Sequence, residues 1–542
     1  MPSMVKNIFA PGRTRRTLRT LPTVALVLLW GALLFTGSLI GAEAGGPSSP
    51  SATPRQGWPN WRGAGCNGSA SETGIDYVDS LKDAKLLWTS EALVFATYVG
   101  SCTGNSGNLV SGVSSPIAVD GKVFLYYYKA ADEPVLLNTY AKPGQAPAHE
   151  RMAKAYDGDT FYKPLMTREE YVHFRSNLYA YDRIICMDAD TGKTLWDTAL
   201  PGLMGGGGRC NAKWEPAYAD GMLAAATDGG RLCGIDAETG KIVWTWTDDA
   251  FVQELDQTAK KRGSPARPGS TANLMIADGV VLYTAGEKRP LRGFDLKTGE
   301  LLWDMVDVGT AAGQTKPRAL GNNVPLRWTH QGKEYGTAGG TCFEPRTGKV
   351  LWHVDGRSLG RGGGSAALSE HHIVFGGSSH GGFTCYRITP DKAELAWALP
   401  KERDGVRLSS GASSPCIVGD HVYGIGERQR DADGQFGMLL CIELASGKII
   451  AEHRIGVARK YKGDPGNDGC TSLFSFGNLL CYRSSGKSID GKIVSWNIAP
   501  QPLSNRQIFE PESCNVAASP TVAGGKLFLR GTGHILCYDI RK

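Results

Sequence analysis

Short apolar runs alternate with glycine-containing turns along most of the chain. One run begins at Ile117, is broken by Asp120-Gly121 and resumes at Val123. The same arrangement of apolar run, turn and apolar run recurs around Asp220-Gly221, Asp278-Gly279, Gly419-Asp420 and Gly524-Gly525, with divergent copies near Asn323, Ser365 and Cys470. Short β-rich runs bounded by Gly, Asp and Pro predict strands joined by tight turns. The pattern therefore predicts eight hairpins.

A second hairpin follows most of these, with the pattern acid-x-x-Thr-Gly-x-x-x-Trp. Four copies match it in full, and they run over residues 188–196, 236–244, 295–303 and 344–352. A fifth, at Glu443–Gly447, keeps the turn without the Trp, and a sixth, at Glu394–Trp397, keeps the Trp without the turn. Gly provides the left-handed turn position, and Trp brings a large apolar area to the outer strand.

Two hairpins per unit give four strands, and eight units fit into the 458 residues from Lys85 onward. The last unit, ending at Ile535–Ile540, lacks an outer strand, whereas Lys85–Trp88 is a strand without a unit. We therefore predict an all-β fold, an eight-bladed β-propeller of four-stranded antiparallel blades, closed by the N-terminal strand. Insertions are expected at 129–177, with a short helix at 167–174, and at 248–270, where Lys260–Arg262 is predicted to be a solvated loop.

The N-terminal region has the pattern of an export signal. Four arginines between Arg13 and Arg19 precede an uncharged apolar run, 21–40, and the small-x-small sequence Ala42-Glu43-Ala44. Residues 1–44 are predicted to be a signal, either cleaved or retained as a membrane anchor. Residues 45–57 are predicted to be a disordered linker, and 58–542 the propeller. We expect export to the periplasm or the cell envelope.

Composition and charge narrow the function classes. The chain has 542 residues, 71 of them Gly, with 41% hydrophobic and 21% charged residues, which excludes a disordered chain and a coiled coil. The net charge of +6 falls to about +2 without residues 1–44. A nearly neutral mature chain gives no reason to expect a nucleic-acid partner.

The acid-x-x-Thr-Gly-x-x-x-Trp unit resembles the tryptophan docking repeat of pyrroloquinoline quinone (PQQ) propellers. These are the quinoprotein alcohol dehydrogenases and their non-enzymatic relatives, including the propeller lipoprotein of the outer-membrane β-barrel assembly machine. Trp58-Pro59-Asn60-Trp61-Arg62-Gly63, placed before the ring, is similar to the start of many secreted PQQ-like propellers of unassigned role. The resemblance covers residues 58–542 and implies the fold. It leaves the function open, because function depends on a site grafted onto the fold.

The resemblance to the dehydrogenases implies a quinone held between a Trp and two adjacent, disulfide-linked cysteines, with Ca²⁺ bound by Glu, Asn and Asp. None of the 13 cysteines is adjacent to another, no matching calcium motif is found, and Cys-x-x-Cys-His is absent. We therefore expect a binding or scaffolding protein with no catalytic residues, no metal and no cofactor. A PQQ- and Ca²⁺-dependent alcohol or sugar oxidoreductase is the alternative.

Eleven of the 13 cysteines fall into two sets. Those at one repeated position near the end of the third strand are interpreted as buried packing thiols: Cys186, Cys342, Cys385, Cys441 and Cys537, with Cys233 displaced by one residue. Pairing within the second set, Cys66, Cys102, Cys210, Cys470 and Cys514, is left open because sequence does not reveal connectivity.

The segments before the first strands of the blades are predicted to surround one mouth of the central channel. They carry glycines and the polar or aromatic residues Arg209, Asn211, Trp214, Arg361, Arg407, Asn467, Asp468 and Asn515. Arg, Asn and Trp together suit an anionic or planar ligand; solvated loops between blades are the competing interpretation. We expect a small-molecule or protein partner at this mouth and a monomeric propeller. Asp431 to Gly434 is predicted to be a hairpin tip rather than a calcium loop.

Overall fold

The computed structural model describes residues that belong to one compact unit, Ser51–Lys542. The described residues are 57–91, 93, 114–130, 146, 148–158, 167–169, 172, 179–205, 215–227, 230–262, 274–284, 290–305, 324–354, 365–377, 381–410, 413–426, 429–431, 434–458, 473–483, 492–512, 518–531 and 533–542. The predicted export signal, 1–44, and the predicted linker up to residue 56 lie outside them, whereas its last residue, Gly57, is described.

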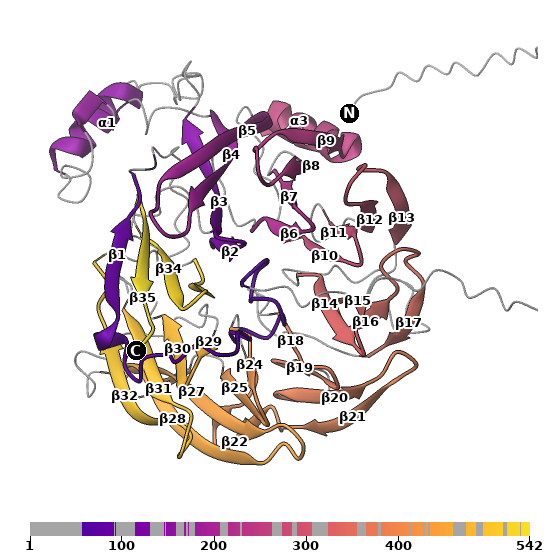
Figure 1. Cartoon of the computed structure of the whole chain (residues 1–542), viewed down its shortest axis with the longest axis vertical. Helices are drawn as coiled ribbons and strands as arrows, with labels where there is room; N and C mark the ends of the chain where they lie inside the picture. The colour runs from indigo at the N-terminus through magenta and orange to yellow at the C-terminus, as the bar shows by residue number, and fades with distance from the viewer. Residues whose placement is uncertain are drawn as a thin grey trace, which may run out of the picture. The chain divides into compact units, whose positions relative to one another are not determined.

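Eight antiparallel sheets form a ring of eight blades (Figure 1). Blades 1 to 4 consist of β2 (Ile117–Val119), β3 (Lys122–Ala130), β4 (Tyr179–Asp188), β5 (Thr194–Gly205); β6 (Ala217–Ala219), β7 (Met222–Ala226), β8 (Arg231–Asp236), β9 (Ile242–Thr247); β10 (Met275–Ala277), β11 (Val280–Tyr283), β12 (Leu291–Asp295), β13 (Leu301–Met305); and β14 (Leu326–His330), β15 (Lys333–Ala338), β16 (Thr341–Phe343), β17 (Val350–His353).

Blades 5 to 8 continue the ring. They consist of β18 (Ala367–Leu368), β19 (His372–Phe375), β20 (Thr384–Ile388), β21 (Ala393–Ala398); β24 (Cys416–Val418), β25 (His421–Ile425), β27 (Gly434–Glu443), β28 (Ile449–Ala458); β29 (Leu473–Phe476), β30 (Leu479–Arg483), β31 (Ile493–Asn497), β32 (Ser504–Phe509); and β33 (Thr521–Ala523), β34 (Lys526–Arg530), β35 (Ile535–Asp539), completed by β1 (Lys85–Thr89). The predicted fold is confirmed.

The pairing of β1 with β35 closes the ring. Lys85 pairs with Asp539 and Trp88 with Cys537, so the N-terminal strand is the outer strand of the last blade. This confirms the closure that the incomplete last unit predicted. A short helix, η1 (Leu81–Asp83), precedes β1.

Short elements project between and beyond the blades. They are the hairpin β22 (Glu402–Arg403) with β23 (Val406–Arg407), the strand β26 (Gln429–Asp431), and the helices α1 (Ala148–Asp157) and α3 (Asp249–Arg262). Asp431 pairs with Gly434, as expected for a hairpin tip. The sequence did not predict α1; in the segment 167–174, Arg168, Glu169 and Val172 are helical. No helix in the described ranges is long and apolar enough to cross a membrane.

The prediction of a solvated loop at Lys260–Arg262 is wrong, because these residues form the end of α3. Asp248 caps the start of this helix: its Oδ1 accepts the Phe251 N–H at 2.9 Å. Phe251 is 8% exposed, lies against Gly230 and belongs to the core between blades, so it anchors this helix to the ring. That anchor depends on Gly230, which lies 21 residues earlier in the chain.

Burial decreases from the channel outward within each blade. The first and second strands are nearly continuous buried runs, as in β29 and β30, whereas β13 in an outer position is mostly exposed. The hydrophobic core therefore lies between blades, where the faces of neighbouring sheets meet.

Tryptophans on the outer strands join six of the eight pairs of neighbouring blades. Each indole Nε1 donates to a backbone carbonyl of the next blade: Trp88 to Ala189, Trp196 to Ala237, Trp244 to Leu296, Trp303 to Pro345, Trp352 to Thr389 and Trp397 to Leu444. Five of these rings also lie on the turn glycines Gly192, Gly240, Gly299, Gly348 and Gly447. The repeated Thr-Gly and Trp positions are thus two halves of one joint.

The remaining two joints use other aromatic pairs. His453 on β28 lies 4.6 Å from Trp496 of blade 7 between ring centroids, and Phe509 on β32 lies 5.3 Å from Tyr538 of blade 8. The loss of the Trp from the fifth copy is therefore compensated in the structure by a histidine whose ring lies tilted against Trp496.

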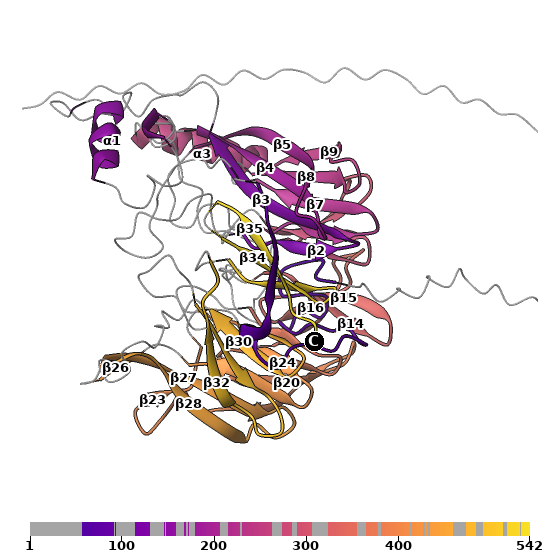
Figure 2. The ribbon, with the colours of Figure 1, turned by 60° about the vertical axis from the view of Figure 1, so that its left-hand side comes forward.

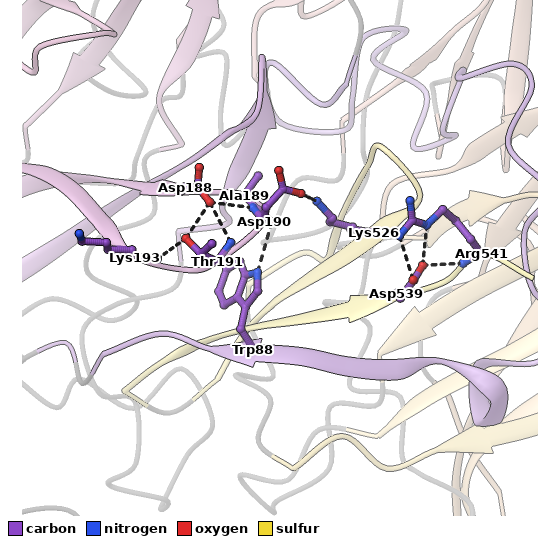
Figure 3. Close-up of polar contacts among 9 residues, drawn as sticks. All are labelled: Trp88, Asp188, Ala189, Asp190, Thr191, Lys193, Lys526, Asp539 and Arg541. Atoms are coloured by element: carbon purple, nitrogen blue, oxygen red, sulfur yellow. Dashed lines mark hydrogen bonds and ion pairs between the residues drawn. The ribbon is translucent and has the colours of Figure 1, made fainter.

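The acid-x-x-Thr part of the repeat builds the turn (Figure 3). Asp188 Oδ1 accepts hydrogen bonds from the N–H groups of Asp190 and Thr191 and from the Thr191 hydroxyl at 2.7–3.1 Å. The hydroxyl bond is the main cause of the lowered pKa of Asp188. Lys526 of blade 8 forms an ion pair with Asp190, so the same turn also contacts the preceding blade.

Candidate functional site

The ring has two unlike faces. The first strand of each blade begins, and the fourth ends, on what we call the loop face; both repeated hairpin turns lie on the opposite turn face. In the side view of Figure 2, α1, α3 and β26 lie on the same side of the ring. Strand direction places all three on the loop face.

Of the eight predicted channel-mouth residues, the structure describes Arg407. It lies on the loop face in β23, where it pairs with Glu402, and its side chain is exposed. The other seven, Arg209, Asn211, Trp214, Arg361, Asn467, Asp468 and Asn515, lie outside the described residues. Their convergence on one mouth stays a prediction.

Hydrogen bonds between the starts of the first strands, here called the belt, join blades 8, 1 and 2 and, separately, blades 5 and 6. The Ser519 N–H donates to Ser115 Oγ at 2.8 Å, and the Ser115 N–H and Oγ both donate to Glu215 Oε1 at 3.1 and 3.0 Å. The Ser365 N–H likewise donates to Ser414 Oγ at 2.9 Å. Each bond runs from one blade to the same position in the next. This explains the repeated Ser or Glu that stands before a Pro in four of these five blades.

Glu215 is the charged member of this belt. Its side chain is 7% exposed, and burial raises its pKa to about 7, although the bonds from Ser115 oppose the shift. Its Oε2 has no hydrogen-bond partner among the described residues. The sequence analysis did not select Glu215. The sequence could have indicated it, because Glu215 precedes Pro216 at the position where other blades have Ser before Pro.

The residues before the ring enter the channel. Residues 57–70, here called the channel plug, bond to the first strands of several blades. Trp58 pairs with Ala118 of blade 1, the Pro59 carbonyl accepts the Tyr218 N–H of blade 2, and Ser69 pairs with Ser475 of blade 7. Figure 1 shows this indigo segment crossing the centre of the ring. Trp58–Gly63 therefore precede the first blade in sequence but lie within the ring.

Two glycines allow the plug to fit. A Cβ on Gly68 would lie 2.7 Å from the Leu473 carbonyl oxygen, and one on Gly63 would lie 3.0 Å from the Trp58 ring. Both have positive φ, as do the non-glycine residues Arg62 (69°) and Cys66 (51°). The plug contacts β2, β6 and β24 at their middle residues, Ala118, Tyr218 and Ile417, and β29 at Leu473 and Ser475, so it fills the channel between these strands.

Cysteines play a packing role throughout the described ranges. Nine of them are buried single thiols: Cys66, Cys186, Cys233, Cys342, Cys385, Cys416, Cys441, Cys481 and Cys537. Cys186, Cys342, Cys385 and Cys537 stand opposite an outer-strand Trp, the position that Gly234 and Gly293 take in blades 2 and 3. A Cβ on Gly234 would lie 2.1 Å from Trp244 Nε1, so this position requires a small residue. Cys102, Cys210, Cys470 and Cys514 lie outside the described residues.

The described residues contain no group of three or more His, Cys, Asp or Glu side chains arranged to hold a metal ion. The chain also cannot build the adjacent-cysteine platform that the dehydrogenase resemblance implies, because no two of its 13 cysteines are neighbours. The residues present therefore do not fit PQQ held in that way.

Eight four-stranded blades with these joints define an eight-bladed propeller of the PQQ-like class. A family model described as "Outer membrane protein assembly factor BamB" matches residues 180–450, and the chain belongs to this family of PQQ-like propellers.

Known relatives within this class differ in function. Tetrathionate hydrolase of Acidithiobacillus ferrooxidans is 24% identical over 51% of this chain and 50% of its own. Quinohemoprotein alcohol dehydrogenase ADH IIB of Pseudomonas putida is 26% identical over 40% of this chain and 31% of its own. This chain therefore spans half or less of their length. A europium-containing methanol dehydrogenase structure aligns with a TM-score of 0.49 and 12% identity, covering 88% of this chain and 90% of that one.

Proposed function

We propose that this propeller is exported and acts as a binding or scaffolding protein in the periplasm or at the cell envelope. The observation that carries the proposal is the channel plug, whose backbone hydrogen-bonds to first strands of blades 1, 2, 6 and 7. A channel filled by the protein's own chain leaves the loop face, which carries the insertions, for a partner. The family description and the N-terminal signal pattern support an envelope location.

The loop face offers the features that a binding surface needs. Functional segments in a rigid scaffold concentrate in loops, and the helices α1 and α3 of the two insertions and the β22–β23 hairpin belong to this face. We propose that Arg209, Arg361 and Arg407 give it an affinity for anionic groups of a protein or small-molecule partner.

Site-specific photocrosslinking tests the binding face in the native host. A photoreactive amino acid replaces Arg407 on the loop face, and the matched control replaces Arg346, which is 55% exposed in a turn-face hairpin. Discrete adducts at position 407 and none at 346 are expected. Adducts at 346 alone, or none at either position, contradict a loop-face scaffold.

A PQQ-dependent oxidoreductase is the second candidate, because a matched relative is a quinohemoprotein alcohol dehydrogenase. Calorimetric titration with PQQ and Ca²⁺ separates the two. We expect no micromolar binding and no dye-linked alcohol oxidation. Micromolar or tighter binding that Arg361→Ala abolishes and Arg346→Ala retains would establish the oxidoreductase instead.

A further inference from the structure

Arg62 carries a positive charge into the channel plug. Its side chain is 2% exposed, and its Nη2 donates to the carbonyl oxygens of Asn67, at 2.8 Å, and of Pro415 on blade 6. No carboxylate in the described ranges forms an ion pair with it; the ionisable groups that act on it are the thiols of Cys66 and Cys416. Burial lowers its pKa to about 10, so the guanidinium remains charged near neutral pH.

Among the described residues, the other N–H groups of Arg62 have no acceptor. Nε and Nη1 are both buried and lack a hydrogen-bond partner among the described residues. A buried donor without an acceptor is costly, and a buried charge without a counter-charge costs more. Backbone carbonyls satisfy Nη2 alone, so the plug lacks an acceptor at the remaining edges of this guanidinium.

A second buried guanidinium adds to the positive charge. Arg327 on β14 is 4% exposed, and its Nη2 donates to the Ala64 carbonyl of the plug at 2.6 Å. Its Nε lies 3.5 Å from Glu334 Oε1, and its Nη1 has no acceptor in the described part of the chain. Cys66 lies within the field of both arginines, yet burial raises the pKa of its thiol, so it stays neutral. Two guanidinium groups and one carboxylate leave one positive charge uncompensated.

We propose that the channel plug encloses a small monovalent anion, chloride or another halide, bound at Arg62 between the plug and β24. The donors have no exposed surface, which favours an ion enclosed during folding over a larger ligand that enters from the loop face. The positive φ of Arg62 fits this role, because a strained backbone at a buried site accompanies binding functions. The anion site does not depend on the proposed scaffold function.

Thermal unfolding in matched salts tests the site. Melting temperatures of the full chain are compared in sodium bromide, sodium chloride and sodium gluconate at equal ionic strength, since gluconate is too large to be enclosed. A ligand that binds the folded state alone raises the melting temperature with its concentration. We expect a halide-dependent rise of a few degrees that saturates. Equal melting temperatures in bromide and gluconate overturn the proposal.

The position of the ion requires a variant and a direct observation. Arg62→Met is expected to lose the difference between halide and gluconate, whereas the exposed control Arg346→Met retains it. Anomalous diffraction from wild-type crystals grown in bromide is expected to place a peak within hydrogen-bonding distance of Arg62 Nε or Nη1. If Arg62→Met does not fold, the anomalous peak in wild-type crystals alone tests the position of the ion. Its absence at Arg62, or an Arg62→Met protein that keeps the halide effect, rejects the site.

Discussion

The indole of Trp88 covers Gly192 so closely that a Cβ on this glycine would lie 2.4 Å from Trp88 Cε3. Trp88 belongs to β1, which completes blade 8, and Gly192 belongs to the repeated turn of blade 1. The Trp88 Nε1 also donates to Ala189 of the same turn at 3.2 Å (Figure 3). One strand from the N-terminal region therefore both covers the edge of the last blade and joins that blade to the first.

Removing the Trp88 side chain is expected to weaken the whole ring. Trp88 is 9% exposed, and Trp88→Ala should lower the free energy of unfolding by about 3–5 kcal/mol, as for other buried aromatic residues. The neighbouring Leu87→Ala is the control, since Leu87 is 44% exposed and should cost less than about 0.5 kcal/mol. Urea unfolding measures both; equal costs would contradict the closure joint.

Deleting residues 80–92 should expose the edge of β35 and cause aggregation, because an unpaired edge strand pairs with other chains. Light scattering and a thermal melt of the purified deletion variant report the outcome. A soluble variant with unchanged melting would be incompatible with closure by β1.

Two glycine substitutions separate backbone strain from the indole contact. Gly192 and Gly121 have nearly equal φ values of 71° and 72°, but a Cβ on Gly121 meets nothing within 4 Å. Gly121→Ala should cost about 1–2 kcal/mol for the left-handed backbone alone. Gly192→Ala should cost clearly more, because Trp88 must move as well. Denaturant titration of both variants tests this. Equal losses in the free energy of unfolding would show that Trp88 moves aside at no cost.

The strand cysteines should be unreactive in the native protein and reduced after unfolding. Burial raises the pKa of Cys186, Cys385 and Cys537 to about 12, so little thiolate forms at neutral pH. An unfolded thiol ionises near pH 8.5. The raised pKa of these buried thiols therefore stabilises the folded state fully below about pH 8.5. This stabilisation is lost as the pH rises toward about 12.

Alkylation followed by peptide mapping tests this prediction. Peptides that contain Cys186, Cys342, Cys385, Cys441 and Cys537 should be unlabelled in the native state and labelled in denaturant without reductant. Disulfide-linked peptides from most of these positions would show that their packing role is misread.

Because of Glu215, the free energy of unfolding should decrease as the pH rises from acidic to neutral values. Its folded pKa of about 7 lies above the unfolded value of about 4.3, so the folded state retains a proton that the unfolded state releases. The contribution is complete below about pH 4.3 and is lost as the pH passes about 7, amounting to about 4 kcal/mol.

Glu215→Gln should remove this dependence. Its amide oxygen can still accept the bonds from Ser115, and the variant should be more stable than the wild type at pH 8. Glu169→Gln, at an exposed position, is the control and should follow the wild type. Unfolding free energies at several pH values provide the measurement; parallel curves for Glu215→Gln and the wild type would show that the carboxyl is not proton-bound.

Much of the fold follows from local chemistry that the sequence displays. The Asp188–Gly192 turn depends on a carboxylate, a hydroxyl and a glycine within five residues, and each makes its contact with near neighbours in the chain. The unpaired Lys85–Trp88 strand was recognisable because a periodic pattern shows which element is missing. The strand count, ring closure and buried cysteines were therefore predictable.

The channel plug depends on contacts that the repeat pattern of the sequence does not indicate. Arg62 meets the carbonyl oxygen of Pro415, 353 residues away, and Trp58 pairs with a strand in another blade. Glu215 occupies a serine position of the belt, and its raised pKa arises from burial that the ring alone creates. Local sequence determined the blades because the bonds of their turns are short in chain length, and it indicated the joints because the Thr-Gly and Trp positions repeat along the chain. Only the tertiary structure determined the plug, the buried charges and the docking of α3, because their energetics arise where distant segments exclude water together.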